Sequence, residues 1–115
     1  MKARLTEREG VLLLAQEFVR AGLTLTEGCP IEVEGGTVHL DAFDPARSVG
    51  FEFVTDEAGD REELTPKVVA ALERKMEAGE AWILLVDEWD VEGPDDLALA
   101  ARRFLGELRS RGVLA

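Results

Sequence analysis

Cysteine and histidine are almost absent from this 115-residue chain, which contains one of each, Cys29 and His39. A single cysteine cannot form an intramolecular disulfide, so a reducing, cytoplasmic compartment is the expected location. One cysteine and one histidine also fall short of the several ligands that a zinc site needs. We therefore interpret Cys29 as a small buried side chain and His39 as a surface or hydrogen-bonded strand residue.

Long apolar runs and phosphate-binding motifs are missing as well. The longest apolar run, residues 81–86, is far shorter than the roughly 20 apolar residues of a membrane-spanning helix. The chain has no glycine-rich dinucleotide motif, no nucleotide-phosphate loop and no nucleophile elbow. These absences argue against a membrane partner and against nucleotide chemistry.

Positive charge is scarce. Thirteen lysines and arginines face 24 aspartates and glutamates, which gives a net charge of -11 and a sequence pI near 4.5. A nucleic-acid-binding protein normally carries a basic stripe, so we expect no nucleic-acid partner. A field of this sign favours a basic protein partner instead.

Three helices are predicted from capping residues and apolar periodicity. Thr6 and Glu9 form a capping-box pattern ahead of a helix over residues 7–21. Thr65 and Pro66 open a second helix, because proline is tolerated at the first helical position. A third amphipathic helix begins at residue 94 or 95 and ends near Gly112.

Four strands are predicted between these helices. Residues 31–34 and 37–43 alternate in polarity and flank a two-glycine hairpin, and residues 49–55 form a third strand. Residues 81–86 are apolar on both faces, which is typical of an interior parallel strand. The order α-β-β-β-α-β-α predicts a single three-layer α/β domain over residues 1–115, at the border of the α+β class. Its mixed four-stranded sheet should carry helices on both faces.

Two acidic residues lie on neighbouring predicted strands. Asp41 is on the second strand, and Glu52 is on the third, within the segment Gly50-Phe51-Glu52-Phe53-Val54. With this element order, the pair resembles the core of the PD-(D/E)XK, restriction-endonuclease-like family. Taken without the resemblance, Glu52 is an exposed or salt-bridged strand residue, and Asp41 is a turn former at a strand end.

The resemblance implies a metal-dependent nuclease or phosphodiesterase of degenerate type. Asp41 and Glu52 would be its catalytic metal ligands, and Mg²⁺ would be its only cofactor. Val54 stands where the family has its lysine, so Lys67 on the following helix is the candidate for a displaced catalytic base. The stretch 41–54 also resembles small bacterial proteins, and that likeness implies no activity.

Acidic loops follow the third and fourth strands. Because the carboxyl ends of parallel strands share one edge of a sheet, we expect the two loops to lie together. Their oxygens suit Mg²⁺ or Ca²⁺ in number, although neither loop has the EF-hand spacing, and two solvated loops are the simpler alternative. The candidate binding residues are Asp56, Glu57, Asp87, Glu88, Trp89 and Asp90.

Trp89 is the one aromatic residue in these loops, and it has two possible roles. It either packs back over the end of the sheet or stands out as a contact residue, since tryptophan is enriched at interface hot spots.

Three functions follow from these patterns. The first hypothesis is a non-catalytic acidic module, without a cofactor, that binds a basic protein through the two loops. The second is the degenerate phosphodiesterase. The third is a structural homo-oligomer that buries a sheet edge.

Overall fold

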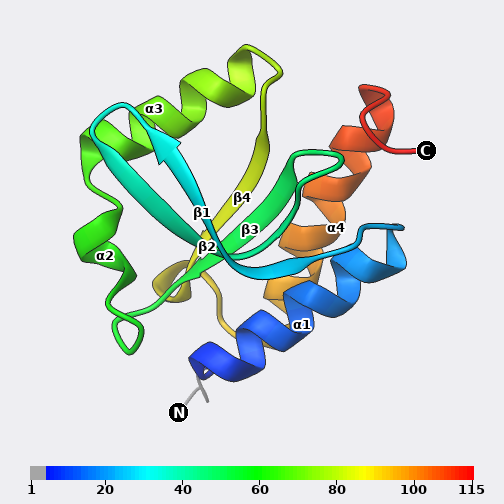
Figure 1. Cartoon of the computed structure of the whole chain (residues 1–115). Helices are drawn as coiled ribbons and strands as arrows, with labels where there is room; N and C mark the ends of the chain where they lie inside the picture. The colour runs from blue at the N-terminus through cyan, green and yellow to red at the C-terminus, as the bar shows by residue number, and fades with distance from the viewer. Residues whose placement is uncertain (1–4) are drawn as a thin grey trace.

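A four-stranded mixed sheet lies between two layers of helices in the computed structural model, which describes residues 5–115 (Figure 1). In chain order, the elements are α1 (Glu7–Arg20), β1 (Thr26–Val33), β2 (Gly36–Asp44), β3 (Val49–Val54), α2 (Asp60–Glu63), α3 (Pro66–Glu77), β4 (Trp82–Asp87), the 3-10 turn η1 (Glu88–Asp90) and α4 (Pro94–Ser110). The strands lie in the order β1-β2-β3-β4, antiparallel except for the parallel pair β3 and β4. The predicted α/β class and element order are confirmed, with α2 and η1 as short additions in the acidic loops.

Side-chain caps define where α1 and α3 begin. The Thr6 hydroxyl accepts the Glu9 N–H at 3.1 Å, and the Glu9 carboxylate accepts the Thr6 N–H at 2.9 Å. This is the predicted capping box, which satisfies N–H groups that lack partners inside the helix. Thr65 likewise accepts the Val68 N–H, and Pro66 occupies the first helical position. Within residues 5–115, none of the helices is both long enough and apolar enough to cross a membrane.

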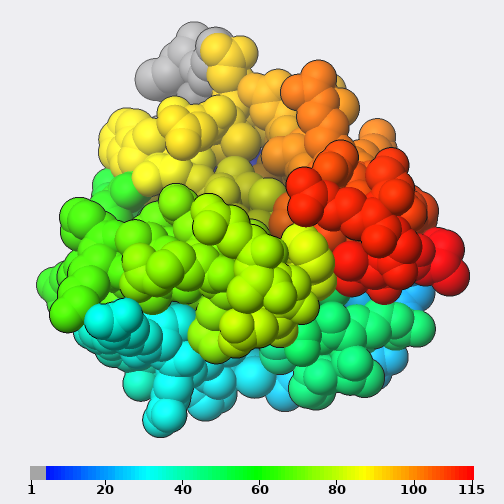
Figure 2. Space-filling model, turned by 90° about the horizontal axis from the view of Figure 1, so that it is seen from above, coloured from blue at the N-terminus to red at the C-terminus, as the bar shows by residue number. Residues whose placement is uncertain are grey.

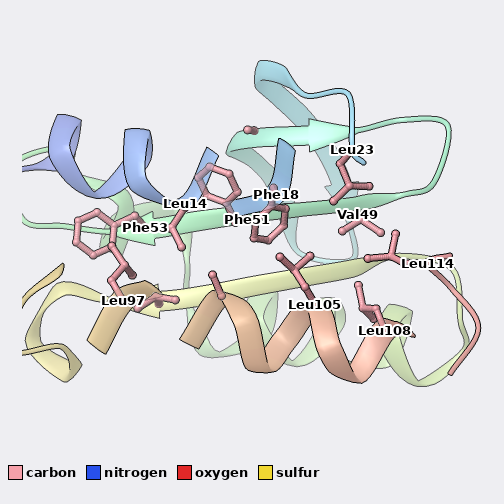
Figure 3. Close-up of a cluster of buried hydrophobic side chains, with 13 residues drawn as sticks. Leu14, Phe18, Leu23, Val49, Phe51, Phe53, Leu97, Leu105, Leu108 and Leu114 are labelled. Atoms are coloured by element: carbon pink, nitrogen blue, oxygen red, sulfur yellow. The ribbon is translucent and has the colours of Figure 1, made fainter. Parts of the chain in front are cut away.

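The helices α1 and α4 cover one face of the sheet and enclose the larger hydrophobic core (Figure 3). The Phe18 ring of α1 meets the Phe51 ring of β3 edge-on, with the ring centroids 4.9 Å apart. Phe53 of β3 is fully buried in the same core. Each such side chain stabilises the fold by about 1.5–3 kcal/mol through burial. The α4 side chains in this core are Leu97, Ala101, Leu105 and Leu108.

The helix α3 covers the opposite face of the sheet and a smaller core. Val68 and Leu72 of α3 pack with Val38 and Leu40 of β2 and with Ile83 of β4. The two cores share one sheet, so the elements form a single domain.

The strand β4 lies at an edge of the sheet, so the predicted interior position of residues 81–86 is wrong. The segment is apolar on both faces because Ile83 belongs to the α3 core, whereas Val86 belongs to the core under α1 and α4. Apolar residues on both faces of a strand therefore indicate that helices cover both faces. They do not indicate that the strand has another strand on each side. The interior parallel strand is β3, whose six residues are all buried.

The strand β1 begins at Thr26, five residues before the predicted strand over residues 31–34. Pro30 is tolerated because β1 is the other edge strand. It stands opposite His39, whose N–H is directed to a side chain of α2 rather than to β1. Pro30 and His39 therefore form a pair without backbone bonds, and the missing N–H of the proline lies on the outer edge.

Asp44 holds the turn between β2 and β3. Its carboxylate accepts the N–H groups of Ala46, Arg47 and Thr24 at 2.8–3.1 Å. Burial disfavours the ionised form, but these hydrogen bonds outweigh burial and keep the pKa of Asp44 below its ordinary value. The interpretation of Asp41 as a turn former at a strand end is wrong, because Asp41 lies inside β2 and the acid of this turn is Asp44.

Gly10 allows α1 to approach β3 closely. A Cβ atom at this position would lie 2.2 Å from an atom of the Phe53 ring, far inside van der Waals contact. Gly106 of α4 differs, because nothing lies within 4 Å of its Cβ position. Packing therefore requires glycine at position 10 and does not require it at position 106.

Replacing Gly10 with alanine should destabilise the fold, whereas Gly106→Ala should stabilise it. In a helix interior alanine is favoured over glycine by about 1 kcal/mol, and only position 106 has room for this gain. At position 10 the methyl group would displace the Phe53 ring, at a cost of about 1–3 kcal/mol. Urea denaturation of both variants measures the difference, and a Gly10→Ala protein as stable as Gly106→Ala would contradict the packing.

Candidate functional site

The two acidic loops meet at the end of the sheet where β3 and β4 terminate. The strands β3 and β4 run parallel, and their carboxyl ends lie side by side in register. The Asp56 N–H donates to the Glu88 carboxylate at 2.6 Å, which ties the loop after β3 to the turn after β4. We call this region the acidic edge. Its side chains are Asp56, Glu57, Asp87, Glu88, Trp89 and Asp90.

Arg61, which the sequence motifs do not single out, lies at the centre of the acidic edge. Its Nε lies 2.6 Å from Asp56 Oδ1, and its Nη2 lies 2.9 Å from Asp87 Oδ1 and 3.8 Å from Glu88 Oε2. The hydrogen bonds from Arg61 keep the pKa of Asp87 below its ordinary value, so this carboxylate stays ionised. One feature of the sequence could have identified Arg61, because it is the one basic residue within residues 56–63.

Trp89 is the most exposed large apolar side chain among the residues that the structure describes. It lies in η1, where the Asp87 carboxylate accepts its N–H at 2.9 Å. Trp89 is 60% exposed, so the alternative in which it packs back over the end of the sheet is wrong. The structure therefore presents an indole ring surrounded by carboxylates at the acidic edge.

Asp41 and Glu52 come together in a gap between β2 and β3. The backbone pairing of these strands ends at Ala42 and Phe51. Beyond that point, the Glu52 carboxyl accepts the Asp41 N–H at 3.1 Å, and the Asp41 carboxylate accepts the Phe53 N–H at 2.7 Å. Side chains thus satisfy backbone groups where the two strands separate.

Glu52 is 1% exposed, so the interpretation of this residue as an exposed strand residue is wrong. Burial raises the pKa of Glu52 far above its ordinary value, and a hydrogen bond to the Asp41 side chain and the charge of Asp41 raise it further. The raised pKa favours the protonated, neutral form of Glu52 at neutral pH.

Glu7 and Asp60 extend this pair into a group that we call the carboxylate cluster: Glu7, Asp41, Glu52 and Asp60. The Thr55 hydroxyl donates to Glu7 at 2.7 Å, and the Thr55 N–H donates to Asp60 at 3.2 Å. Burial raises the pKa of Glu7 to about 7, with the charges of Asp41 and Asp60 adding to the effect against the Thr55 hydrogen bond. Burial and the charge of Asp41 also raise the pKa of Asp60. Sequence spacing alone could not identify Glu7 and Asp60, because they come from α1 and α2.

Lys67 does not join the Asp41–Glu52 pair. Its side-chain carbons lie over Gly35 in the β1–β2 hairpin, 3.1–3.4 Å from where a Cβ of that residue would be. Gly35 is roughly 20 Å from Asp41 along β2, at about 3.3 Å per residue. Within residues 5–115, no three acidic, histidine or cysteine side chains are arranged to hold a metal ion.

The surroundings of His39 and Cys29 fit structural roles for both residues. His39 Nδ1 lies 2.9 Å from a Glu63 carboxylate oxygen, and the His39 N–H donates to the same carboxylate. The predicted hydrogen-bonded strand residue is therefore confirmed. Cys29 is half-buried against the α3 core, rather than fully buried as predicted.

Comparison of the chain with protein-family models, curated proteins and solved structures finds no significant match to any of them.

The carboxylate cluster should make the free energy of unfolding fall as pH rises from about 4.5 to about 7. In this range the raised pKa values of Glu7 and Glu52 keep protons on the folded chain that the unfolded chain releases. Each such proton lowers stability by up to about 1.4 kcal/mol per pH unit. Glu52→Gln keeps an acceptor for the Asp41 N–H and a donor for the Asp41 carboxylate, with no proton to lose. It should be more stable than the wild type at neutral pH, with a flatter pH dependence.

Urea titrations between about pH 5 and about pH 8 measure this effect, because in that window the unfolded chain has released protons that the folded chain keeps on Glu52 and, up to about pH 7, on Glu7. Glu32→Gln is the matched control, since it makes the same glutamate-to-glutamine replacement at an exposed position on β1. The same pH slope in Glu52→Gln and in the wild type would show that Glu52 is ionised in the folded protein.

Proposed function

We propose that this chain is a non-catalytic module that binds a basic protein partner through its acidic edge. The observation that carries the proposal is the exposure of Trp89 in a turn flanked by Asp87, Glu88 and Asp90. Burying an indole ring beneath a partner releases a large apolar area, and tryptophan is a frequent hot-spot residue. The surrounding carboxylates supply the polar rim that such a hot spot needs.

Charge supports a basic partner in particular. The net charge of -11 attracts cationic surfaces over the distance of the screening length, which is about 8 Å at physiological salt. Arg61 neutralises only part of the acidic edge, since it contacts three carboxylates with one guanidinium. Its contacts also hold the two loops together before binding, which lowers the entropy that a partner must remove. The single cysteine favours a partner in the same reducing, cytoplasmic compartment.

Replacing Trp89 with alanine should weaken capture of the basic partner roughly 10- to 30-fold, the loss typical of a hot-spot residue. The immobilised chain is exposed to host extract at low and high salt. Proteins retained only at low salt are then purified, and their affinities are measured by calorimetry. Capture should fall at high salt because screening weakens the attraction.

Val19→Ala is the matched control, because Val19 is 57% exposed and lies near the far end of α1 from Glu7, whose N–H contacts Glu57 of the acidic edge. Equal affinities of the Trp89→Ala and Val19→Ala variants for the purified partner would exclude the acidic edge as the contact region.

The convergence of Asp41 and Glu52 favours a second candidate, a divalent-cation-dependent phosphodiesterase. These are the two residues that the restriction-endonuclease-like resemblance implies as metal ligands. A cation at this pair would have to displace the proton of Glu52 and compete with the N–H groups of Asp41 and Phe53. The carboxyl groups of Glu7 and Asp60 feel the Asp41 charge. No third side chain within residues 5–115 is arranged to join the pair as a ligand, so water would have to supply the remaining oxygens.

This candidate predicts that Mn²⁺ raises the melting temperature of the wild type but not of Glu52→Gln. A cation at about 100 times its dissociation constant stabilises the folded state by about 2.7 kcal/mol, a rise of roughly 10 °C for a domain of this size. Differential scanning calorimetry with and without Mn²⁺ measures the shift. Equal melting temperatures for the wild type in the two conditions would remove this candidate.

A further inference from the structure

The outer edge of β4 forms the floor of a groove between α3 and α4. Figure 2 shows the groove as the hollow between the yellow-green surface of α3 and the orange-to-red surface of α4. At one end it widens into a hollow of about 350 Å³ with Met76, Trp82 and Phe104 in its lining. At the other end its lining includes Asp87 and Asp90, so the groove continues into the acidic edge.

We infer that this groove takes an extended, basic segment of the partner, which pairs with β4 as a fifth strand of the sheet. The inference rests on the proposed function, and it names the mode of recognition. Strand addition of this kind obtains affinity from main-chain hydrogen bonds and specificity from pockets for alternate side chains.

Alternate backbone N–H and C=O groups of β4 point away from β3, as pairing with an added strand requires. The Trp82 N–H donates to the Ser48 carbonyl beside β3 at 2.8 Å, so Trp82 faces into the sheet. Backbone groups alternate in direction along a strand, and Ile83, Leu85 and Asp87 therefore direct theirs outward. The Ile83 N–H lies 3.5 Å from the Met76 sulfur of α3, which agrees with this direction. A thioether is a weak acceptor, so a peptide carbonyl would replace it readily.

The side chains around β4 favour alternating apolar and basic residues in the added segment. Trp82 and Leu84 pack on the α4 side of the sheet, and Leu85 packs on the α3 side, so apolar contacts are available on both faces. Six acidic side chains and three arginines line the three hollows of the groove. Glu73 and Glu77 of α3 lie at one end, and the carboxylates of the acidic edge lie at the other.

The same charges disfavour a second copy of the chain as the occupant. Pairing β4 with its own symmetry mate would place two net-negative grooves against each other. Each copy is also strongly acidic, with a formal net charge of -11, and the repulsion between two copies opposes association. A cationic segment meets attraction at every one of these positions.

The test uses the full chain and a monomeric peptide of about ten residues, long enough for one strand, that alternates lysine with valine or alanine. Calorimetry gives its affinity, and amide hydrogen exchange followed by NMR locates the contact. We expect slower exchange at Leu85, and about 10-fold weaker binding of the same peptide N-methylated at alternate residues, because methylation removes main-chain donors. Equal binding of the two peptides, or protection elsewhere than β4, would overturn strand addition.

Charge variants test the walls of the groove. Glu73→Lys/Glu77→Lys should weaken binding of the peptide about 10-fold. Glu27→Lys/Glu32→Lys makes the same change in charge on the exposed β1 strand, and should leave the affinity within about twofold of the wild type. Equal losses in the two double variants would show attraction by net charge alone and would overturn the assignment to the groove.

The outcomes separate this inference from the proposed function. A natural partner that depends on Trp89 but not on Glu73 and Glu77, and that leaves Leu85 unprotected, would overturn the groove and leave the acidic edge as the binding site. A peptide that protects Leu85, while no retained protein depends on Trp89, would support the groove and refute the acidic edge. Protection of Leu85 that appears with protein concentration alone, together with a dimer by light scattering, would overturn the inference in favour of a second copy.

Discussion

The parallel pairing of β3 with β4 determines where almost every notable group of this protein lies. It begins at the hydrogen bond from Trp82 to Ser48 and ends where Val54 is paired with Asp87. Because both strands stop at the same level, their two acidic loops leave the sheet side by side. The contacts of Arg61 across those loops, and the turn that exposes Trp89, depend on that coincidence.

Two groups of acidic residues in the chain have different physical roles. Asp41, Glu52 and Glu63 are hydrogen-bonded to backbone N–H groups where β2 has lost β3 as a partner. The acids of the acidic edge instead lie in two loops at the carboxyl ends of β3 and β4. A count of charges cannot separate these groups, because a buried carboxyl is stable only when it is hydrogen-bonded or protonated. The net charge of -11 consequently overstates the charge that the folded protein carries at neutral pH, since Glu52 holds its proton.

Local signals predicted the parts of the fold that depend on local chemistry. The capping box at Thr6 and Glu9 and the Thr65-Pro66 start of α3 are confirmed, because a cap acts within one turn of helix. The edge position of β4 could not be predicted, because α3 and α4 cover its two faces as they would those of an interior strand. The early start of β1 was missed because Pro30 is acceptable only on an outer edge, which the sequence does not reveal.

The candidate site, like the fold, was predictable only in part. Asp41 and Glu52 lie directly beyond the last paired residues of β2 and β3, Ala42 and Phe51, so a resemblance at the level of strand order was enough to group them. Glu7 and Arg61 join their clusters through tertiary packing of α1 and of the loop after β3, and no spacing rule connects them to their neighbours. Lys67 was misplaced for the same reason, since the orientation of α3 directs it to the hairpin.

The two edges of the sheet are unlike, and this matters for self-assembly. On β1, Pro30 offers no donor, and the neighbouring Gly28 has a positive φ of 61°, so the outer side of that strand is a poor template for another chain. The other side, along β4, lacks such a block. A molecule with one closed side and one open side can add a single strand but cannot grow end to end into a fibre.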